Sequence, residues 1–337
     1  MNTKKADMII DLQYGSTGKG LIAGYLAEKE GYDVCVTANM PNAGHTYIDS
    51  KDQKMVHKVL PNGVVSPSCE WAVIGPGAVF SVERLIAELD HLDSLGYSGF
   101  RVAIHPNACV LLPRHINGED HLHTIGSTKQ GSAAAMIEKI NRRTDPGHCL
   151  ARNYKDIIPK KADEVLTEGR VEVVSHEDYR MIISCARRIL LEGAQGYSLG
   201  INQPFWPYAT SRECTPARFM SDMMIPLPML TKVIGVARVH PIRVGGTSGG
   251  CYDDQEELTW QKVGQIPELT TVTQRERRVF GFSYRQMNDA IWETQPDEIF
   301  LNFCNYDKNK ALEIRFNYPD RIRYMGWGPA QKDVEEV

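Results

Sequence analysis

The chain has 337 residues, with 38 Lys plus Arg against 42 Asp plus Glu, which leaves a formal net charge of −4. Hydrophobic residues make up 42% and charged residues 24%, a composition typical of an ordered globular chain that can bury a large core without disulfides or metals. The near-balanced charge argues against a protein that coats nucleic acid, and no apolar run is long enough to span a bilayer.

Short apolar runs alternate with helical patterns along the chain. The predicted strands are Met8–Leu12, Val34–Ala38, Trp71–Gly75, Arg101–His105, Arg188–Leu191, Val233–Val239 and Glu298–Cys304. The predicted helices are Lys19–Glu30, Val82–Leu95, Ser132–Ile140 and Tyr284–Glu293. This alternation predicts an α/β fold, a single domain over residues 1–337 in which helices flank a central, mainly parallel sheet. The acidic tail Gln331–Val337 is expected to fray.

Two long polar stretches, Gly193–Arg218 and Val244–Arg278, carry few helix or strand signals. Stretches of this length in a compact domain are usually functional loops or disordered segments. Because both are rich in Gly, Thr, Gln and Arg, we expect functional loops.

The 8 cysteines are scattered from Cys35 to Cys304, and none of them forms a CxxC pair. The N-terminal residues run directly into the first predicted strand, without the apolar core of a signal peptide. Such cysteine usage is typical of a reduced intracellular protein rather than of a disulfide scaffold or a zinc site. We therefore expect a cytoplasmic protein that binds neither nucleic acid nor membranes.

A glycine-rich loop, Gln13–Gly20, joins the first predicted strand to the first predicted helix. Glycines let the backbone adopt positive φ and bring N–H groups close to a ligand, and a helix N-terminus favours an anion. The loop therefore predicts a phosphate site, although a tight turn without a ligand is the alternative for such a loop taken alone.

Two common phosphate-binding patterns fit this loop poorly. The Walker pattern G-x-x-x-x-G-K-S/T fails at Gln13 and at Gly20. The dinucleotide pattern G-x-G-x-x-A fits at Gly18, Gly20 and Ala23, but the acidic residue expected after the next strand is missing. A nicotinamide-dependent oxidoreductase is therefore a remote alternative.

The second predicted strand leads into a second loop, Asn39–Thr46, which carries His45. Open parallel sheets bind ligands at the carboxyl ends of their strands, where both loops lie. A histidine beside a phosphate site can donate a hydrogen bond to a phosphate or act as a general acid.

These loops, together with later segments, resemble the adenylosuccinate synthetase family. Gly15–Gly20 resembles the family's GDEGKG loop, and Asn42–Thr46 matches its NAGHT loop letter for letter. Further segments resemble the family's IGTT, EGAQG, YVTS, RVGAG and TTGRRRR motifs, in order, at Ile125–Thr128, Glu192–Gly196, Tyr208–Ser211, Arg243–Gly246 and Thr271–Arg278. The matches run over nearly the whole chain, and they imply a P-loop-NTPase-like adenylosuccinate synthetase fold.

The resemblance implies a C–N ligase that works in two steps and uses Mg²⁺. A nucleoside triphosphate phosphorylates the 6-oxo group of a purine monophosphate, and the amine of L-aspartate then displaces that phosphate. His45 would be the electrophile or general acid on the transferred phosphoryl group, and Ser16 occupies the position of the family's general base. The family's enzymes are homodimers, so a homodimer is expected here.

The resemblance also assigns binding residues. The triphosphate would contact Gly15, Thr17, Gly18, Lys19, Gly20, Gly44, Thr46, Arg277, Asn305, Asp307, Gly328 and Pro329. The purine monophosphate would contact Ser16, Asn42, Ala43, Thr128, Gln195, Thr210, Val244 and Arg275, with Arg142 supplied by the partner subunit. Aspartate would be held by Thr271, Val272, Thr273, Gln274, Arg275 and Arg277, whose guanidinium groups suit carboxylates. The metal would contact Ser16 and the Gly44 carbonyl.

Two departures from the family pattern bear on the substrates. Ser16 stands where the family has an aspartate that acts as general base and metal ligand, and a serine hydroxyl takes no proton at neutral pH unless another base activates it. Asn305 replaces the lysine of the family's guanine-reading TKxD segment, whereas Asp307 is kept.

These departures resemble a viral branch of the family, the N6-succino-2-amino-2′-deoxyadenylate synthases, which act on dGMP with aspartate and ATP and supply 2-aminoadenine for DNA. ATP-dependent ligation of aspartate to dGMP is therefore the leading prediction, in a viral protein of the host cytoplasm. The alternatives are an ordinary adenylosuccinate synthetase that uses IMP and GTP, and a nucleotide-binding homologue without catalysis.

Overall fold

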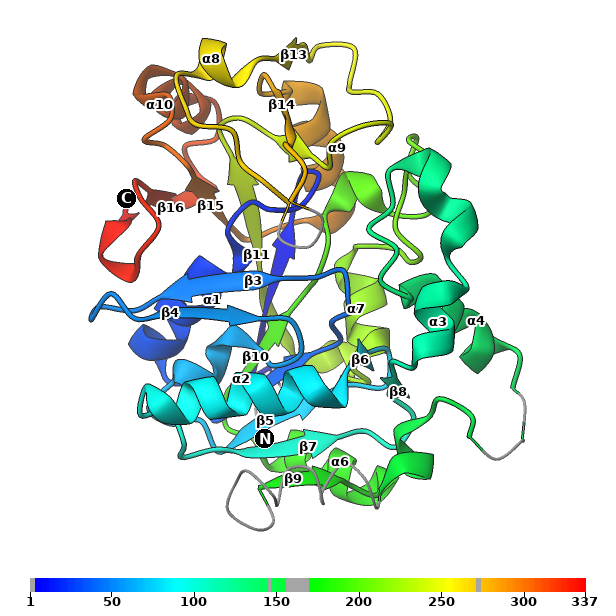
Figure 1. Ribbon diagram of the computed structural model, residues 1–337. Coiled ribbons are helices and arrows are strands. Elements are labelled where there is room, and N and C mark those ends of the chain that lie inside the picture. Colours follow the sequence, from blue (N-terminus) through cyan, green and yellow to red (C-terminus); the bar gives the residue numbers. More distant parts are fainter. Residues whose placement is uncertain (1–3, 143, 145–146, 156–169, 271–273) are drawn as a thin grey trace.

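A ten-stranded sheet runs through the computed structural model, which describes residues 4–142, 144, 147–155, 170–270 and 274–337 (Figure 1). Its strand order is β17-β16-β15-β11-β1-β10-β2-β5-β7-β9. Neighbouring strands are parallel throughout, apart from the antiparallel pair β16 and β17. The α/β fold with a mainly parallel central sheet is thereby confirmed.

The strands of this sheet are β1 (Ala6–Asp11), β2 (Val34–Thr37), β5 (Trp71–Ile74), β7 (Arg101–Ile104), β9 (Val171–Val173), β10 (Ile189–Glu192), β11 (Leu230–Arg238), β15 (Glu298–Asn302), β16 (Ile322–Gly326) and β17 (Val334–Glu336). Three small sheets lie outside it. They are formed by β3 (His45–Ile48) with β4 (Lys54–His57), by β6 (Val79–Phe80) with β8 (Cys109–Val110), and by β12 (Ile242–Arg243), β14 (Arg278–Phe280) and β13 (Glu257–Leu258).

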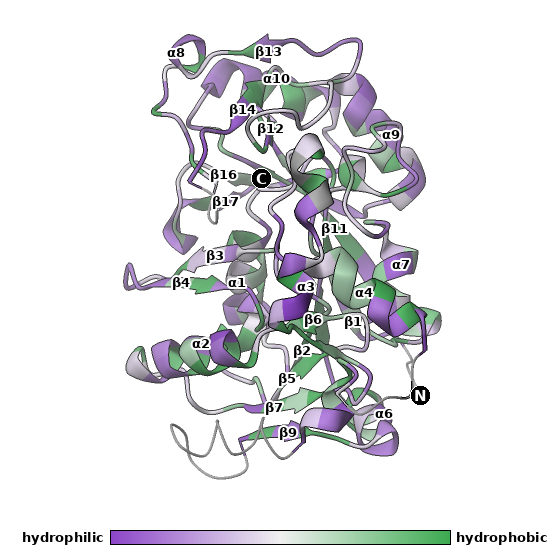
Figure 2. Cartoon of the chain, turned by 45° about the vertical axis from the view of Figure 1, so that its right-hand side comes forward, coloured by the Kyte–Doolittle hydropathy of each residue, from purple (hydrophilic) through white to green (hydrophobic). Residues whose placement is uncertain are grey.

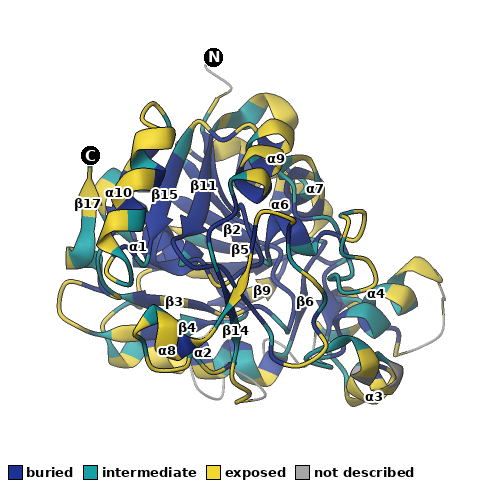
Figure 3. Ribbon diagram, turned by 90° about the horizontal axis from the view of Figure 1, so that it is seen from above, coloured by how far each residue is buried: buried dark blue, intermediate teal, exposed yellow. Residues whose placement is uncertain are grey.

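Helices cover both faces of the large sheet. They are α1 (Lys19–Glu30), α2 (Val82–Ser94), α3 (Pro113–Asn117), α4 (Ser132–Ile140), α6 (His176–Cys185), α7 (Pro216–Asp222), α8 (Trp260–Val263), α9 (Tyr284–Thr294) and α10 (Lys308–Asn317). One apolar core packs α1 and α2 against one face, and a second packs α6, α7, α9 and α10 against the other. Figures 2 and 3 show the result, an apolar, buried sheet between helices whose outer faces are polar and exposed.

The predicted strands and helices are confirmed with small shifts at their ends, and α1 and α4 have the predicted bounds. The elements that the sequence analysis missed include β9, β16 and β17 of the large sheet, the three small sheets, and the helices α6, α7 and α10. Two of these helices carry a capping signal: the Ser175 side chain accepts a hydrogen bond from the Asp178 backbone at the start of α6, and Asp307 caps α10 through Lys310 N. The two polar stretches are mostly loops, as predicted, but they contain α7, α8 and β13.

The expectation that the acidic tail frays is wrong. Residues 334–336 form β17, which adds an antiparallel strand to β16. Glu336 forms ion pairs with both Lys29 and Arg323, and these contacts fix the acidic tail to the rest of the chain. The tail therefore covers an edge of the sheet that would otherwise present unpaired backbone groups.

Within the described ranges, no helix combines the length and apolarity that crossing a membrane requires. The cysteines are free thiols and six of them are buried, whereas Cys251 is partly exposed and Cys185 is exposed.

Candidate active site

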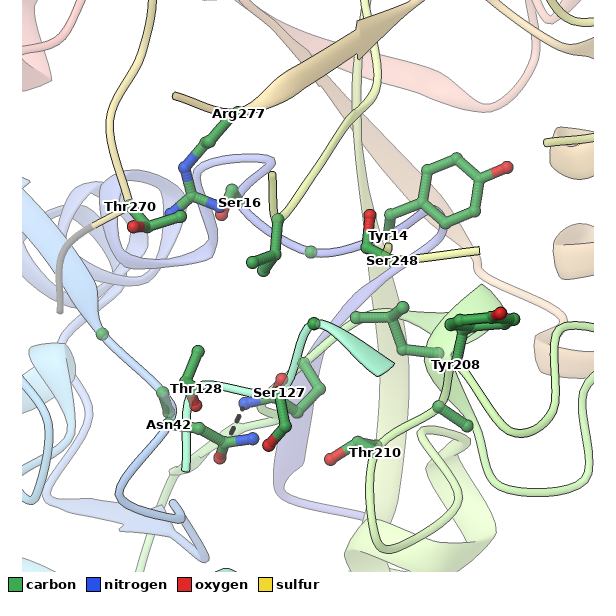
Figure 4. Close-up of a pocket in the computed structure, with 18 of the residues that line it drawn as sticks. Tyr14, Ser16, Asn42, Ser127, Thr128, Tyr208, Thr210, Ser248, Thr270 and Arg277 are labelled. Carbon is green, nitrogen blue, oxygen red and sulfur yellow. Dashed lines mark hydrogen bonds between the residues drawn. The ribbon is translucent and has the colours of Figure 1, made fainter. Parts of the chain in front are cut away.

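A polar cavity lies at the carboxyl ends of β1, β2, β10 and β11, where the loops after these strands converge (Figure 4). This is where open parallel sheets place their ligands. The cavity is lined by Tyr14, Gly15, Ser16, Lys19, Asn42, Ala43, Gly44, His45, Ile125, Gly126, Ser127, Thr128, Gln195, Leu199, Tyr208, Ala209, Thr210, Val244, Ser248, Thr270 and Arg277. The described lining thus includes Lys19 and Arg277 but no carboxylate, which suits an anionic ligand.

The glycine loop bends sharply between β1 and α1. Gly15, Ser16 and Gly18 all have positive φ, at 88°, 56° and 102°. A Cβ on Gly18 would lie 2.0 Å from the Asn302 side-chain nitrogen, so only glycine fits at that position. Ser16 is exposed and lines the cavity, which places a neutral hydroxyl where the family has a carboxylate.

A buried carboxylate that the sequence analysis overlooked lies beneath this loop. Asp11 is 2% exposed and accepts hydrogen bonds from the backbone N–H groups of Gln13 (2.9 Å) and Gly15 (3.1 Å) and from the Thr17 hydroxyl. Its Oδ2 atom also lies 3.0 Å from Lys19 Nζ. An aspartate that ends an apolar strand directly before a glycine loop was the signal that could have identified it.

Lys19 begins α1 and reaches the cavity from its floor. Besides the ion pair with Asp11, its Nζ donates to the Gln195 carbonyl at 2.8 Å. The side chain is 5% exposed, so the ammonium group has a fixed position. A fixed cation at a helix N-terminus, beside a glycine loop, is suited to hold phosphate oxygens.

His45 lies at the start of β3, with its Nδ1 3.6 Å from Glu192 Oε2. Burial lowers the pKa of His45, whereas Glu192 acts in the opposite direction, and the net shift is downward. The imidazole is therefore neutral at neutral pH, and the carboxylate favours the proton on Nδ1. Glu192 ends β10 and is itself fixed by Gly63 N, which donates to its Oε1 at 2.7 Å.

The wall of the cavity that faces Arg277 carries neutral hydrogen-bond donors and acceptors. Figure 4 shows them at Asn42, Ser127, Thr128 and Thr210. Gln195 has a positive φ of 67° and donates through Nε2 to Asn42 Oδ1 at 3.2 Å. The Thr210 hydroxyl is buried and has no hydrogen-bond partner among the described residues. Because buried polar groups are normally satisfied, this hydroxyl indicates the place of a ligand atom.

An aromatic cluster closes one end of the cavity. The Tyr14 hydroxyl donates to Gln255 Oε1 at 2.8 Å, and the Arg243 guanidinium lies 4.7 Å from the centre of the Tyr14 ring and 5.0 Å from that of Phe205. Arg243 is 3% exposed, so its buried guanidinium packs against these rings and stabilises their arrangement.

Of the described residues assigned to aspartate, Arg277 lines the cavity, and Thr270, which directly precedes the assigned segment, lines it as well. Arg277 Nε donates to the Leu269 carbonyl at 3.3 Å, which directs the guanidinium along the segment. Gln274 and Arg275 are exposed and do not line the cavity, and the assignments to Thr271, Val272 and Thr273 lie outside the described residues.

The cavity thus brings together many of the residues that the sequence assigned: Gly15, Ser16, Lys19, Asn42, Ala43, Gly44, His45, Thr128, Gln195, Thr210, Val244 and Arg277. Tyr14, Leu199, Ser248 and Thr270 line it as well and had been given no role. Thr17, Gly18, Gly20 and Thr46 do not line it, although Gly18 and Gly20 shape the turn from behind. A Cβ on Gly20 would meet the Thr46 carbonyl at 2.6 Å.

The residues assigned to the triphosphate base form a separate group beyond the ends of β15 and β16. They are Asn305, Asp307, Gly328 and Pro329. This group adjoins the glycine loop, because the Asn302 side chain donates to the Thr17 carbonyl at 3.0 Å and Cys304 N donates to the Gly326 carbonyl. Asp307 caps α10 here, so its carboxylate already accepts a hydrogen bond from a backbone amide.

Arg142 follows α4 with a positive φ of 52°, is exposed and does not line the cavity of its own chain.

The side chains around the cavity would hold Mg²⁺ only with help from a ligand. Ser16 and Gly44 are exposed and supply neutral oxygens, and Mg²⁺ binds readily where substrate phosphates and waters complete its shell. In the described ranges, one group of potential metal-binding side chains lies elsewhere, at His115, Glu138 and Cys149. There the Arg114 guanidinium binds both oxygens of Glu138, which disfavours a cation.

Comparisons with known proteins agree with this geometry. The family description "Adenylosuccinate synthetase" matches residues 8–178 and 160–324. The N6-succino-2-amino-2′-deoxyadenylate synthase of Vibrio phage phiVC8 is 53% identical over 344 residues, which cover 98% of either chain. The synthase of the same name from Acinetobacter phage SH-Ab 15497 is 44% identical and covers 98% of this chain and 93% of its own.

Two solved structures share the fold. The succinoaminodeoxyadenylate synthetase of Cyanophage S-2L, bound to dGMP and to dATP as an energy donor, has a TM-score of 0.87 at 36% identity and covers 99% of this chain and 95% of its own. The fully ligated adenylosuccinate synthetase of Plasmodium falciparum has a TM-score of 0.78 at 21% identity, with coverages of 98% and 99%. This chain belongs to the adenylosuccinate synthetase family.

Proposed function

We propose that the chain is an ATP-dependent C–N ligase that joins L-aspartate to the 6-position of dGMP and forms N6-succino-2-amino-2′-deoxyadenylate, ADP and phosphate. The observation that carries the proposal is Ser16, a neutral, exposed hydroxyl in the glycine loop of a cavity whose described lining has no carboxylate. The 53% identity to a phage synthase over nearly the whole chain supports the same substrate. The chain would act as one domain over residues 1–337.

In the first step, the 6-oxygen of dGMP attacks the γ-phosphoryl group of ATP, and ADP leaves. Lys19 would hold phosphate oxygens with its fixed charge, and the neutral His45 would donate a hydrogen bond to the transferred group. Interactions of this kind stabilise charge that develops during phosphoryl transfer. Ser16 would donate or accept a hydrogen bond, so the N1 proton has to leave through water, another group or a substrate phosphate.

In the second step, the amine of aspartate attacks C6 and the 6-phosphate leaves with the C–O bond electrons. The amine loses a proton to solvent, and the purine gains the C–N bond. The loop of Thr271, Val272, Thr273, Gln274, Arg275 and Arg277 would hold the aspartate carboxylates. Support comes from Arg277, which enters the cavity close to Ser16 in Figure 4.

The monophosphate would lie along the neutral wall. Asn42, Thr128, Gln195 and Thr210 offer amides and hydroxyls, and the unpartnered Thr210 hydroxyl favours a ligand oxygen there. Ala43, Val244 and Arg275 would complete this site, and Arg142 would reach it from the partner subunit of a homodimer.

The triphosphate would extend from the glycine loop toward β15 and β16. Gly15, Thr17, Gly18, Lys19, Gly20, Gly44, Thr46 and Arg277 would surround its phosphates, and Asn305, Asp307, Gly328 and Pro329 its base. Mg²⁺ would be held by the phosphates, Ser16 and the Gly44 carbonyl, and it would neutralise phosphate charge. Loss of the family's lysine at Asn305 removes one guanine contact, which favours ATP over GTP.

The test is an incubation of the enzyme with aspartate and Mg²⁺, in which dGMP or IMP is combined with ATP or GTP and the product mass is read. The proposal predicts a succinylated product from dGMP with ATP as the preferred donor. A product from IMP alone would refute it and support an ordinary adenylosuccinate synthetase, and no product from any pair would support a binding protein without catalysis.

The shared site is tested by mixing subunits. Arg142→Ala chains and His45→Asn chains are each expected to be nearly inactive, and their mixture should regain activity if subunits exchange. A fully active monomer would rule the homodimer out.

A further inference from the structure

Arg238 is a fully buried arginine at the end of β11, beneath the glycine loop. Its Nη1 donates to the Ser16 backbone carbonyl at 3.0 Å, and its guanidinium forms two bonds to Glu268, at 3.3 and 2.5 Å. The ring centre of Phe303 lies 3.7 Å from its Cζ. The side-chain amide of Gln13 accepts from Arg238 N and donates to Arg238 O, at 2.9 and 3.1 Å. The backbone of Arg238 is therefore held in place by Gln13, and its guanidinium contacts the Ser16 carbonyl directly.

Glu268 connects the same arginine to two other segments. Its backbone carbonyl accepts a hydrogen bond from Arg277 N at 2.8 Å, and its carboxylate accepts one from the Tyr306 hydroxyl at 3.1 Å. Arg277 lines the cavity, and Tyr306 follows Asn305 in the segment assigned to the triphosphate base. One ion pair thus contacts the glycine loop, the segment that leads into the aspartate loop, and the segment after β15.

We propose that Arg238 and Glu268 are positioning residues that couple aspartate binding to occupancy of the triphosphate site. The inference rests on the proposed function, because it takes the three segments as the sites of phosphates, aspartate and base. A planar guanidinium satisfies the Ser16 carbonyl, both Glu268 oxygens and the Phe303 ring in one arrangement only. A triphosphate that fixes the glycine loop and residues 303–306 favours this arrangement, and with it the placement of Glu268 and Arg277 that aspartate needs.

Arg170 offers a matched control far from the cavity, beside β9 at the other end of the sheet. It is 8% exposed, donates through Nη1 to Asp93 at 2.5 Å and through Nε to the Phe100 carbonyl at 3.1 Å, and its Cζ lies 4.6 Å from the Phe100 ring centre. Arg170→Lys therefore disturbs the same kinds of contact as Arg238→Lys, without touching a segment that lines the cavity.

The experiment measures the dissociation constant of L-aspartate. The full-length enzyme is used in the oligomeric state in which it purifies, and it is saturated with dGMP and Mg²⁺. Each titration is made with and without a non-hydrolysable ATP analogue, and the ratio of the two constants is the coupling. The variants are Arg238→Lys, Glu268→Gln and the milder Tyr306→Phe, with Arg170→Lys as the control. Melting temperatures are recorded for all of them.

We expect the analogue to tighten aspartate binding by about fivefold or more in the wild-type enzyme, the lower range of measured couplings. The ratio should fall below about twofold in Glu268→Gln and Arg238→Lys, fall partly in Tyr306→Phe, and stay at the wild-type value in Arg170→Lys even where the melting temperature drops. If Arg238→Lys does not fold, the ratios measured for Glu268→Gln and Tyr306→Phe still test the proposed coupling.

Two results would overturn the inference: no tightening in the wild-type enzyme, or the same ratio in all variants as in the wild type. Product formation by the wild-type enzyme separates the two proposals. A wild-type enzyme that forms no succinylated dGMP refutes the proposed function, whereas an active enzyme with unchanged ratios refutes only the coupling.

Discussion

Two loops deliver polar groups to the cavity, and each rests on a buried carboxylate, but the two pairs differ in character. Under the glycine loop, Asp11 lies 3.0 Å from Lys19 Nζ and accepts three further hydrogen bonds, so its charge is fully compensated. Under the second loop, Glu192 Oε2 lies 3.6 Å from His45 Nδ1, and in the part of the chain that the structure describes neither atom has a hydrogen-bond partner. A tight, satisfied pair makes a fixed charge, whereas a loose pair leaves a neutral imidazole able to adjust to a ligand.

The largest expected effect on activity follows from replacing His45, the imidazole of the loose pair. His45→Asn keeps a polar side chain but removes the imidazole that faces the transferred phosphoryl group. We expect kcat on dGMP to fall by about 10²–10⁴-fold, the usual contribution of a positioned acid–base group. Steady-state assays with a coupled ADP readout measure this, and a loss below tenfold would mean that His45 is not the group that acts on the phosphoryl.

Neutral replacements of the two carboxylates should differ in how strongly they change stability. Asp11→Asn leaves the buried Lys19 ammonium without its counter-charge, so we expect a loss of about 3–5 kcal/mol in unfolding free energy, as for a broken buried pair. Glu192→Gln replaces a carboxylate oxygen that has no partner, and it should change stability by less than about 1 kcal/mol. Urea unfolding of both variants provides the comparison, and equal losses would show that the two pairs are alike.

The Ser16 side chain is neutral and exposed, so its replacement should be mild. If the hydroxyl only forms hydrogen bonds, Ser16→Ala loses about tenfold in single-turnover rate on dGMP. This loss corresponds to about 1.4 kcal/mol, within the range for a neutral hydrogen bond. Ser98→Ala, at an exposed residue that does not line the cavity and has no assigned role, serves as a control of similar size. A loss as large as that of His45→Asn would identify Ser16 as an activated proton acceptor.

The smallest effect concerns His57, which lies opposite His45 across β3 and β4. Burial lowers the pKa of His57 to about 4. Between pH 6.5 and 4 the unfolded chain binds a proton that the folded chain does not, so this residue reduces stability as the pH falls. His57→Gln should therefore flatten the acid side of the stability–pH curve. The same slope in the variant and the wild-type protein would contradict this assignment.

Much of the fold could be predicted from the sequence, because buried parallel strands and glycine loops leave strong local signals. The segments from residue 8 to 44 illustrate this, since their strands, loops and helix lie where the sequence pattern indicated, whereas β3, which begins at His45, was missed. β16 and β17 were missed because their pairing depends on distant partners, such as the contacts of Glu336 with Lys29 and Arg323.

The lining of the site could be predicted where a motif carried it, as for Asn42 and Gln195. The supporting pair of Arg238 and Glu268 could not, because it acts through contacts between segments far apart in the sequence, whereas Asp11 contacts residues of the adjoining loop. Arg238 and Glu268 are separated by 30 positions, and a buried ion pair leaves no local pattern. Such groups become visible only when the strands bring them under the same loop.

The most direct test of the account is a competition between dGMP and IMP at equal concentration, with ATP, aspartate and Mg²⁺, followed by mass analysis of both succinylated products. The ratio of the two products gives the ratio of the kcat/KM values. The account, in which a neutral Ser16 replaces the family's carboxylate beside the purine, predicts that the succinylated product of dGMP dominates. Predominance of the product of IMP would contradict it.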